Sequence, residues 1–410
     1  MNTHWQKKSQ DEIKKIVFEA LDKNVNYQEQ NIVGLPATYL DEKVFSQDES
    51  FLKDAPFLSA LIKNPNHIGC HTLEGSENFF SGTQEIEKKL IEICAVDILK
   101  GTTGAQDGYV ASGGTEANMQ ALWIYRNLFM QEFGATLNEI VILCSEDSHY
   151  SMHKGSNLLA IDICTATVEH ETRKLQVDLL TQQIAAQKAN GKKYFIVVAN
   201  MMTTMFGSVD DIDVYVDALH AADVEFKLHV DGAYGGFYYP FSNEKNTLNF
   251  KNKYVTSVTL DAHKMVQAPY GTGVFLIRKG YMQYANTKEA SYVEGEDFTM
   301  IGSRSGANAI AIWMILSKNG PNGWFEKIYI LQKRAQWLCT QLDEMNIAYY
   351  RYPTANIITI KSEFVPKSLA QTFGLVPDNH HNPSWYKVVI MDHVTIEKLS
   401  LLLTALKNNA

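Results

Sequence analysis

The hydrophobic positions in the middle of the chain change repeatedly between two periods. Apolar residues recur at helical spacing from Gln84 to Ile98 and again from Ala117 to Phe129. Between about residue 84 and residue 280, helical stretches alternate with short β-branched runs, which are residues 140–143, 194–199, 226–230, 255–260 and 273–277. This alternation predicts an α/β fold in which helices cover both faces of a mostly parallel sheet.

The two ends of the chain have different patterns. A helical pattern around residues 13–20 precedes three prolines that break the next segment into short pieces, so we expect an extended N-terminal arm. After Pro321, a helical stretch, two short strands at 356–361 and 386–391 and a final helix from Thr395 predict a smaller α+β domain. The expected parts are the arm (residues 1–70), a large domain (71–300) and a small C-terminal domain (301–410).

Composition narrows the class of protein. The 410 residues are 45% hydrophobic and 20% charged, and 37 Lys and Arg against 46 Asp and Glu give a formal charge of -9. An acidic chain without a long apolar segment argues against a nucleic-acid or membrane partner, so we expect a cytoplasmic protein that binds small molecules. The five cysteines are scattered, without a Cys-x-x-Cys pair, and are expected to be reduced core residues.

Ligands of open α/β sheets bind beyond the carboxyl ends of the strands, so polar residues at predicted strand ends are the candidates for a site. In residues 108–118 a short apolar run ends where a helix begins, at Ser112, Gly113, Gly114 and Thr115. Glycines let the backbone approach an anion, and the free N–H groups and the helix dipole face it. A phosphate site is the prediction, and an ordinary turn with a Thr cap is the alternative. No lysine follows in the P-loop register, so a nucleoside triphosphate is not expected.

Two further strand ends carry charged residues. Asp231 closes the run 226–230, where a buried carboxylate needs a cation such as a protonated heterocycle nitrogen, although it could simply cap the next helix. Lys264 follows the run 255–260. A partly desolvated lysine can lose its proton and attack a carbonyl, although most lysines do not.

A histidine follows a fourth predicted strand. His149 and His153 are four residues apart and could share a helical face as metal ligands, but no third ligand has suitable spacing. We favour instead an imidazole of His149 that lies flat against a planar ligand.

Together these parts suit one cofactor, pyridoxal 5'-phosphate. The cradle would hold the phosphate, Asp231 would keep the ring nitrogen protonated, Lys264 would hold the aldehyde as a Schiff base and His149 would cover one face of the ring. No metal is expected.

The same residues carry a family resemblance. From about Gly34 to Ile396 the chain resembles the group II pyridoxal-phosphate-dependent amino-acid decarboxylases of fold type I, and most of all the short bacterial histidine decarboxylases. The matching stretches are 108–119, His149-Tyr150-Ser151, 199–212 with Asp210-Asp211-Ile212, 229–241, His263-Lys264-Met265 and 299–306 with Gly302-Ser303-Arg304. The resemblance implies a mostly parallel, seven-stranded type of sheet sandwiched by helices.

The resemblance also implies roles for single residues. Lys264 would form the internal aldimine, Asp231 would pair with the pyridine nitrogen, Ala233 would lie under the ring and His149 would stack above it. The residues implied around the phosphate and the ring substituents are Ser112, Gly113, Gly114, Thr115, His263 and Thr204. Ser303 and Arg304 would support the phosphate or the substrate carboxylate from the neighbouring subunit. The implied substrate-contacting segment holds Leu35 and Pro36, and His71 either joins it or is a surface or satisfied histidine.

Members of this family are homodimers with shared active sites. The resemblance implies that a loop at residues 284–297 crosses from the partner with a tyrosine that reprotonates the quinonoid carbon. Tyr292 is the matching tyrosine, and Tyr281 and Tyr284 are its competitors.

The expected function is α-decarboxylation of an L-amino acid to the primary amine and CO₂. The residues themselves support imine chemistry, whereas the choice of the carboxylate bond rests on the resemblance. Residues 69–83 and 267–273 differ from the histidine enzymes, so the side-chain pocket is expected to differ as well. Histidine-like or aromatic substrates are favoured, and acidic or diamino acids stay open. The alternatives are a carbon-carbon lyase, a transaminase and a catalytically idle binding module.

Overall fold

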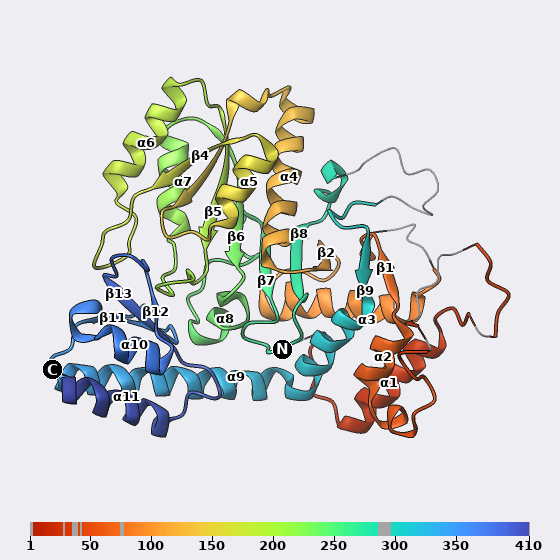
Figure 1. Cartoon of the computed structure of the whole chain (residues 1–410). Coiled ribbons are helices and arrows are strands. Elements are labelled where there is room, and N and C mark those ends of the chain that lie inside the picture. The colour runs from red at the N-terminus through yellow and green to blue at the C-terminus, as the bar shows by residue number, and fades with distance from the viewer. Residues whose placement is uncertain are drawn as a thin grey trace. The chain divides into compact units, whose positions relative to one another are not determined.

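The computed structural model describes residues 3–27, 29–34, 40–41, 43–73, 78–285 and 297–409 (Figure 1). The chain forms two compact units, each assembled from two stretches of sequence. The first unit contains Met1–Leu137 and Asn249–Trp324, and the second contains Asn138–Leu248 and Phe325–Ala410. The expected domain boundaries near residues 70 and 300 stay a prediction.

The N-terminal part of the first unit contains the helices indicated around residues 13–20 and from Gln84, and two short helical elements between them where an extended arm was expected. Ser9 and Glu12 form a capping box at the start of the first helix, and Pro56 occupies the first position of the second, where its missing N–H costs nothing. The elements are α1 (Gln10–Asp22), a 3-10 turn (Ser50–Asp54), α2 (Pro56–Lys63), α3 (Ser81–Glu92) and a π-helical turn (Ile93–Ile98). α1 packs against α2 and α3.

Three strands of the first unit belong to the predicted sheet. They are β2 (Gln106–Ala111), β7 (Val255–Asp261) and β8 (Gly273–Arg278). β8 runs antiparallel to both β2 and β7. α4 (Gly114–Phe133) packs against β7 and β8, and every residue of β2 and β7 is buried. A separate antiparallel pair joins β1 (Asn66–Ile68) to β9 (Ser303–Ser305).

The second unit contains four parallel strands in the order β6-β5-β3-β4. Their bounds are β3 (Ile140–Ser145), β4 (Asp162–Ala166), β5 (Tyr194–Asn200) and β6 (Glu225–Gly232). The helices between them are α5 (Ser151–Leu159), α6 (Val177–Ala189) and α7 (Ile212–Ala221), of which α6 and α7 lie side by side (Figure 1). Because the strands are parallel, their carboxyl ends meet at one edge of the sheet.

The C-terminal part of the second unit is the expected α+β arrangement. An antiparallel sheet has the order β10-β11-β13-β12, and α10 packs against α11. The bounds are β10 (Tyr349–Tyr350), β11 (Ile357–Lys361), α10 (Lys367–Phe373), β12 (Val376–Pro377), β13 (Trp385–Val389) and α11 (Ile396–Asn409). The two predicted strands and the final helix are therefore confirmed to within a few residues.

The helix predicted after Pro321 is also present, but a helical segment precedes it. α9 (Gly306–Glu344) is interrupted at Gly320, whose φ of 65° and ψ of 173° are not helical, and Pro321 opens the second segment. The first segment was not predicted, because its apolar run shows no helical periodicity that separates it from a buried strand.

The α/β class and the mostly parallel sheet are confirmed, with three sheet strands in the first unit and four in the second. All five cysteines are free and buried, as expected for reduced core residues. Among the described residues, no helix combines the length and the apolar character needed to cross a membrane. Two small helices, the Tyr239–Ser242 turn (α8) and the Gly235–Phe237 3-10 turn, follow β6.

Candidate active site

The predicted phosphate site lies at the N-terminus of α4. β2 ends at Ala111 and α4 begins at Gly114, with Ser112 and Gly113 forming the turn. No side chain caps this helix, so the Thr cap considered as an alternative does not form. The first-turn N–H groups and the helix dipole face the turn, which is the geometry that favours an anion.

Two of the amides in this turn already have carboxylate partners. The Ser112 N–H donates to Oε2 of Glu116 at 2.6 Å, and the Gly114 N–H donates to Oδ2 of Asp261 at 3.3 Å. A phosphate would therefore rely on the remaining amides of the turn and on the hydroxyls of Ser112 and Thr115, which are not buried.

The space around Gly113 is bounded on one side by backbone and on the other by a histidine. A Cβ at Gly273, the first residue of β8, would lie 2.5–2.7 Å from backbone atoms of Gly113, so the two glycines are in direct contact. A Cβ at Gly113 itself would meet one atom within 4 Å, Cε1 of His263 at 3.6 Å. His263 therefore borders the open side of the turn, and its expected contact with a phosphate stays a prediction.

Lys264 follows the end of β7, next to a carboxylate that the sequence did not suggest. Asp261 is 3% exposed, and its Oδ1 lies 2.8 Å from Nδ1 of His263 while its Oδ2 lies 3.6 Å from Nζ of Lys264. Asp261 thus touches the helix turn, the histidine and the lysine. It was missed because an aspartate within an apolar run carries no signal of its own in a single sequence.

Asp231 lies at the carboxyl end of β6, one residue before its last, as predicted. It is 7% exposed, and Oδ1 accepts the N–H of Ala233 at 3.0 Å. No helix begins directly after it, because Gly235–Phe237 is a short 3-10 turn, so the helix-cap alternative for Asp231 does not apply.

His149 occupies the turn between β3 and α5. Its Nδ1 lies 2.9 Å from Oγ of Ser151, and its ring lies 4.1 Å from the Tyr150 ring at a tilt of 41°. His149 precedes α5, whereas His153 lies inside it, so the two histidines do not share a helical face. The metal-ligand alternative for this pair finds no support in the described residues.

A buried polar network joins this turn to β5. Nδ2 of Asn200 lies 3.1 Å from Oγ of Ser145, 2.8 Å from Oγ of Ser148 and 2.8 Å from Oδ2 of Asp210. Asn200 is also paired in register with Asp231 across β5 and β6. The sequence singled out the Asp210-Asp211-Ile212 motif without a role for it, and gave no signal for Asn200.

Thr204 lies in the segment that follows β5. It is exposed, and its carbonyl oxygen accepts from Nζ of Lys387 at 2.9 Å. Its proposed contact with the cofactor stays a prediction.

Arg304 and Ser303 lie on β9 with different surroundings. Ser303 is exposed, and its hydroxyl accepts from Nδ2 of Asn66 at 3.1 Å. Arg304 is 7% exposed and pairs with Glu87 at 2.6 Å, while it also donates to the carbonyl oxygens of Val110 and Gly69. The guanidinium charge is thus matched within this chain, and the expected contacts of Arg304 with a phosphate or a substrate carboxylate stay predictions.

Among the described residues, His71 is buried, and its Nε2 lies 3.5 Å from Oε2 of Glu87. It is 2% exposed, burial lowers its pKa to about 3, and neither ring nitrogen has a hydrogen-bond partner there. With His67 and Glu87 it forms the one described cluster of potential metal ligands. Because Arg304 already balances the charge of Glu87, a divalent cation there would be poorly compensated.

Three predicted site residues, Leu35, Pro36 and Tyr292, lie outside the described residues. Of the competitors of Tyr292, Tyr284 donates its hydroxyl to Oε1 of Glu132 at 2.8 Å. The Tyr281 ring lies 6.4 Å from that of Tyr284.

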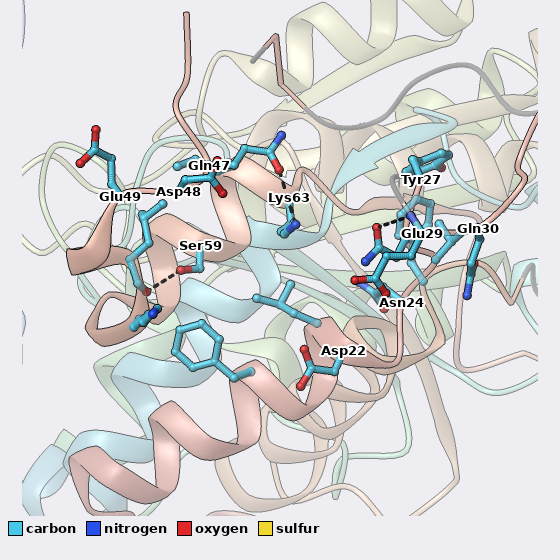
Figure 2. Close-up of a pocket in the computed structure, with 18 residues that line it drawn as sticks. Asp22, Asn24, Tyr27, Glu29, Gln30, Gln47, Asp48, Glu49, Ser59 and Lys63 are labelled. Atoms are coloured by element: carbon cyan, nitrogen blue, oxygen red, sulfur yellow. Dashed lines mark hydrogen bonds between the residues drawn. The ribbon is translucent and has the colours of Figure 1, made fainter. Parts of the chain in front are cut away.

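A pocket of about 690 Å³ in the first unit is separate from these residues (Figure 2). It is bordered by α1, by residues 24–27, 29 and 30 and by residues of α2, with Lys63 donating to Gln47 across one side. Acidic and amide side chains line much of it, and no described site residue does. We therefore do not assign the predicted chemistry to this pocket.

The described site residues form two groups, one within each unit. In the first unit, the turn before α4, His263 and Lys264 gather around Asp261. In the second, the Asn200 network links the end of β6 to the turn of His149. The first group is Ser112, Gly113, Gly114, Thr115, His263, Lys264, Ser303 and Arg304, and the second is His149, Thr204, Asp231 and Ala233.

Comparisons with known proteins agree with this chemistry. The profile of the pyridoxal-dependent decarboxylase conserved domain matches residues 83–348. A tryptophan decarboxylase of Clostridium sporogenes is 49% identical over 405 residues, which cover 98% of this chain and 97% of that protein. An L-aspartate/L-glutamate decarboxylase of Pyrococcus horikoshii is 29% identical, over 92% of this chain and 98% of its own length. Among solved structures, L-methionine decarboxylase from Streptomyces sp. 590 has a TM-score of 0.71 at 20% identity and covers 97% of this chain and 94% of its own, a likeness of fold.

Proposed function

This chain belongs to the pyridoxal-dependent decarboxylase family, and we propose that it decarboxylates an aromatic L-amino acid, tryptophan before histidine, to the primary amine. Family membership makes it a carboxy-lyase of fold type I that uses pyridoxal 5'-phosphate. The order of substrates is the proposal, and 49% identity over almost the whole chain to a tryptophan decarboxylase carries it. The finer resemblance to histidine decarboxylases makes histidine the second substrate to test.

The residues of the first unit fit the phosphate and the aldehyde of this cofactor. The uncapped start of α4, the hydroxyls of Ser112 and Thr115 and the imidazole of His263 would hold the phosphate. Lys264 would supply the amine that holds the aldehyde, and Asp261 would keep that amine and the imidazole in place. These assignments are proposals that the geometry of the unit supports.

The residues of the second unit fit the ring. Asp231, buried at the end of β6, would hold a proton on the ring nitrogen, because a carboxylate in that position favours a positively charged partner. His149 would pack on one face of the ring and Ala233 on the other. When bound, pyridoxal phosphate withdraws electrons from the α-carbon of the amino acid joined to it, which permits loss of the carboxylate.

Release of labelled CO₂ from carboxyl-labelled amino acids tests the reaction, and chromatography of the amines tests the substrate. The panel is tryptophan, histidine, tyrosine, phenylalanine, aspartate, glutamate, diaminobutyrate and ornithine. We expect kcat/KM for tryptophan to exceed that for every other acid by at least about tenfold, a difference of about 1.4 kcal/mol in transition-state binding. Faster release from histidine or aspartate would overturn the substrate proposal.

Two lysine variants test the proposed amine. Lys264→Ala is expected to lose CO₂ release and the absorption band that borohydride abolishes. Lys279→Ala, an exposed lysine just after β8, is the control and should keep both. Equal loss in both variants, or none in Lys264→Ala, would contradict the assignment.

A further inference from the structure

The segment between β5 and α7 is a loop whose base is closed by two residues. The N–H of Asn200 donates to Oδ2 of Asp210 at 2.9 Å, and the N–H of Asp210 donates to the carbonyl oxygen of Asn200, also at 2.9 Å. Nδ2 of Asn200 donates to the same Oδ2 at 2.8 Å. We call these three bonds between Asn200 and Asp210 the clasp.

Within the loop, the chain continues as a narrow hairpin. Met201 and Val209 form an antiparallel bridge, and Thr203 pairs with Ser208 through backbone and hydroxyl contacts. Thr204 lies next to this pair. Because the hairpin starts at Asn200 and ends at Asp210, the clasp determines where the loop that carries Thr204 leaves the sheet.

The clasp also reaches the other two ring contacts proposed for this unit. Asn200 is the register partner of Asp231, and the N–H of Met201 donates to the carbonyl oxygen of Asp231 at 2.9 Å. The amide of Asn200 lies 2.8 Å from the hydroxyl oxygen of Ser148, the residue before His149. The carboxyl group of Asp210, which is 6% exposed, thus orients Asn200, and Asn200 contacts both the end of β6 and the turn before α5.

We propose that Asp210 is a positioning residue of the cofactor site, holding Asn200 so that Thr204, Asp231 and the His149 turn keep their places. This inference rests on the proposed roles of those three residues. Asp210 contacts none of the reacting groups itself.

The clasp requires a hydrogen-bond acceptor at the position of Oδ2 of Asp210, and it does not require a negative charge there. Burial raises the pKa of Asp210 to about 7, so its carboxyl is partly protonated at neutral pH while Oδ2 still accepts from Asn200. An amide oxygen has two lone pairs and can accept the same two bonds. Asp210→Asn should therefore preserve the clasp, whereas Asp210→Ala removes its two side-chain bonds and leaves only the backbone bond.

The neighbouring aspartate provides a matched control. Asp211 is exposed and caps α7, with Oδ1 accepting the N–H of Asp213 at 3.1 Å. Asp211→Ala removes a carboxylate from the same motif, and its loss of a cap should lower stability without moving the clasp.

The test is the affinity of the full-length apoprotein for pyridoxal phosphate, with the visible circular dichroism of the bound cofactor. We expect Asp210→Ala to raise Kd at least about tenfold and to weaken the dichroic band, Asp210→Asn to stay within about threefold of wild type, and Asp211→Ala to bind normally. Substrate turnover is not needed, so a wrong choice of substrate would leave this result intact.

Thermal unfolding distinguishes a loss of positioning at the cofactor site from a general loss of stability. Asp210→Ala and Asp211→Ala should both lower Tm, but only the first should change Kd and the dichroic band. An unchanged Kd in Asp210→Ala, or an equal rise in Asp210→Asn, would overturn the proposal.

If Asp210→Ala does not fold, Ser148→Ala decides. It removes one contact of Asn200 beside the His149 turn and should weaken the dichroic band while Tm stays close to wild type. A wild-type band in Ser148→Ala would overturn the proposal in that case.

Discussion

Buried carboxylates in this chain have different hydrogen-bond and ion-pair partners. The partners determine the direction of the pKa shift and the cost of a substitution. Glu87, on α3, is 1% exposed and contacts Nη1 of Arg304 at 2.6 Å and Nδ1 of His67 at 2.5 Å. Burial by itself would raise the pKa of Glu87, but Arg304 and His67 hold it well below its usual range. Glu87 also accepts the N–H of Val110, so it supports the end of β2 just before the predicted phosphate site.

Glu87→Gln should therefore be strongly destabilising. The variant leaves the buried Arg304 charge without its partner, which costs roughly 3–5 kcal/mol of the free energy of unfolding. Glu85→Gln on the same helix is the control, because Glu85 is exposed beside Lys88 and its loss should cost less than about 0.5 kcal/mol. Chemical denaturation of both variants measures the difference, and similar values would contradict the importance of the buried pair.

The pKa of Asp210 is shifted in the opposite direction to that of Glu87, and this shift makes the stability of the protein depend on pH. Burial, with a contribution from Asp147 and Asp211, raises its pKa from 3.8 to about 7. Between about pH 4 and pH 7 the folded protein then holds a proton that the unfolded chain releases. The free energy of unfolding should therefore fall as pH rises through this window, by at most about 1.4 kcal/mol per pH unit from this group.

Asp210→Asn removes this titration and retains the acceptor. Denaturation of the apoprotein at pH 5 and at pH 7 should show the wild type losing more stability over that interval than the variant. Parallel pH profiles for the two proteins would show that Asp210 does not titrate in this range.

At the scale of elements, periodicity was a good guide wherever an element has one buried face. The runs predicted as strands became β3, β5, β6, β7 and β8, with ends displaced by no more than two residues. The helix at 117–129 became α4, which begins at Gly114, directly after the turn of Ser112 and Gly113. Charged and polar residues at these strand ends then pointed to the candidate site.

What the sequence could not predict depends on contacts between distant residues. The place of Asp261 in the site depends on its contact with Gly114, which is 147 positions away. The surroundings of Arg304 depend in the same way on Glu87, which is 217 positions away. Such contacts leave no periodic trace in a single sequence. The helix indicated around residues 13–20 became α1, whereas α2 was not predicted, because the prolines of that segment indicated only short pieces.

The contact between β8 and the turn before α4 gives a prediction at this scale. In Gly273→Ala the new Cβ would lie 2.5–2.7 Å from backbone atoms of Gly113, which cannot rotate away. We expect a loss of about 1–3 kcal/mol of stability and weaker binding of pyridoxal phosphate, because the turn would be displaced.

Gly323→Ala provides the control for this substitution. Gly323 lies within α9, and its added Cβ would come no closer than 4.0 Å to another atom, so stability should be unchanged or rise by up to about 1 kcal/mol. Denaturation and cofactor titration of both variants provide the check. Normal cofactor affinity in Gly273→Ala would mean that the turn tolerates displacement.

The expected homodimer with shared sites is a prediction about the whole molecule. Lys264 is proposed to act in the subunit that carries it, and the family resemblance places Tyr292 in the site of the neighbouring subunit. In that arrangement Lys264→Ala damages one site of a mixed dimer, and Tyr292→Phe on the other chain damages that same site. The second site keeps both residues.

Co-expression of the two variants with different affinity tags tests this. Lys264→Ala alone should be inactive, and Tyr292→Phe alone should decarboxylate slowly, with some abortive transamination. Random pairing makes about half of the dimers mixed, each with one intact site, so activity should recover to about a quarter of wild type. If Tyr292 instead acts in its own subunit, both sites of the mixed dimer are damaged, and purification of the doubly tagged dimer should yield no activity beyond that of Tyr292→Phe.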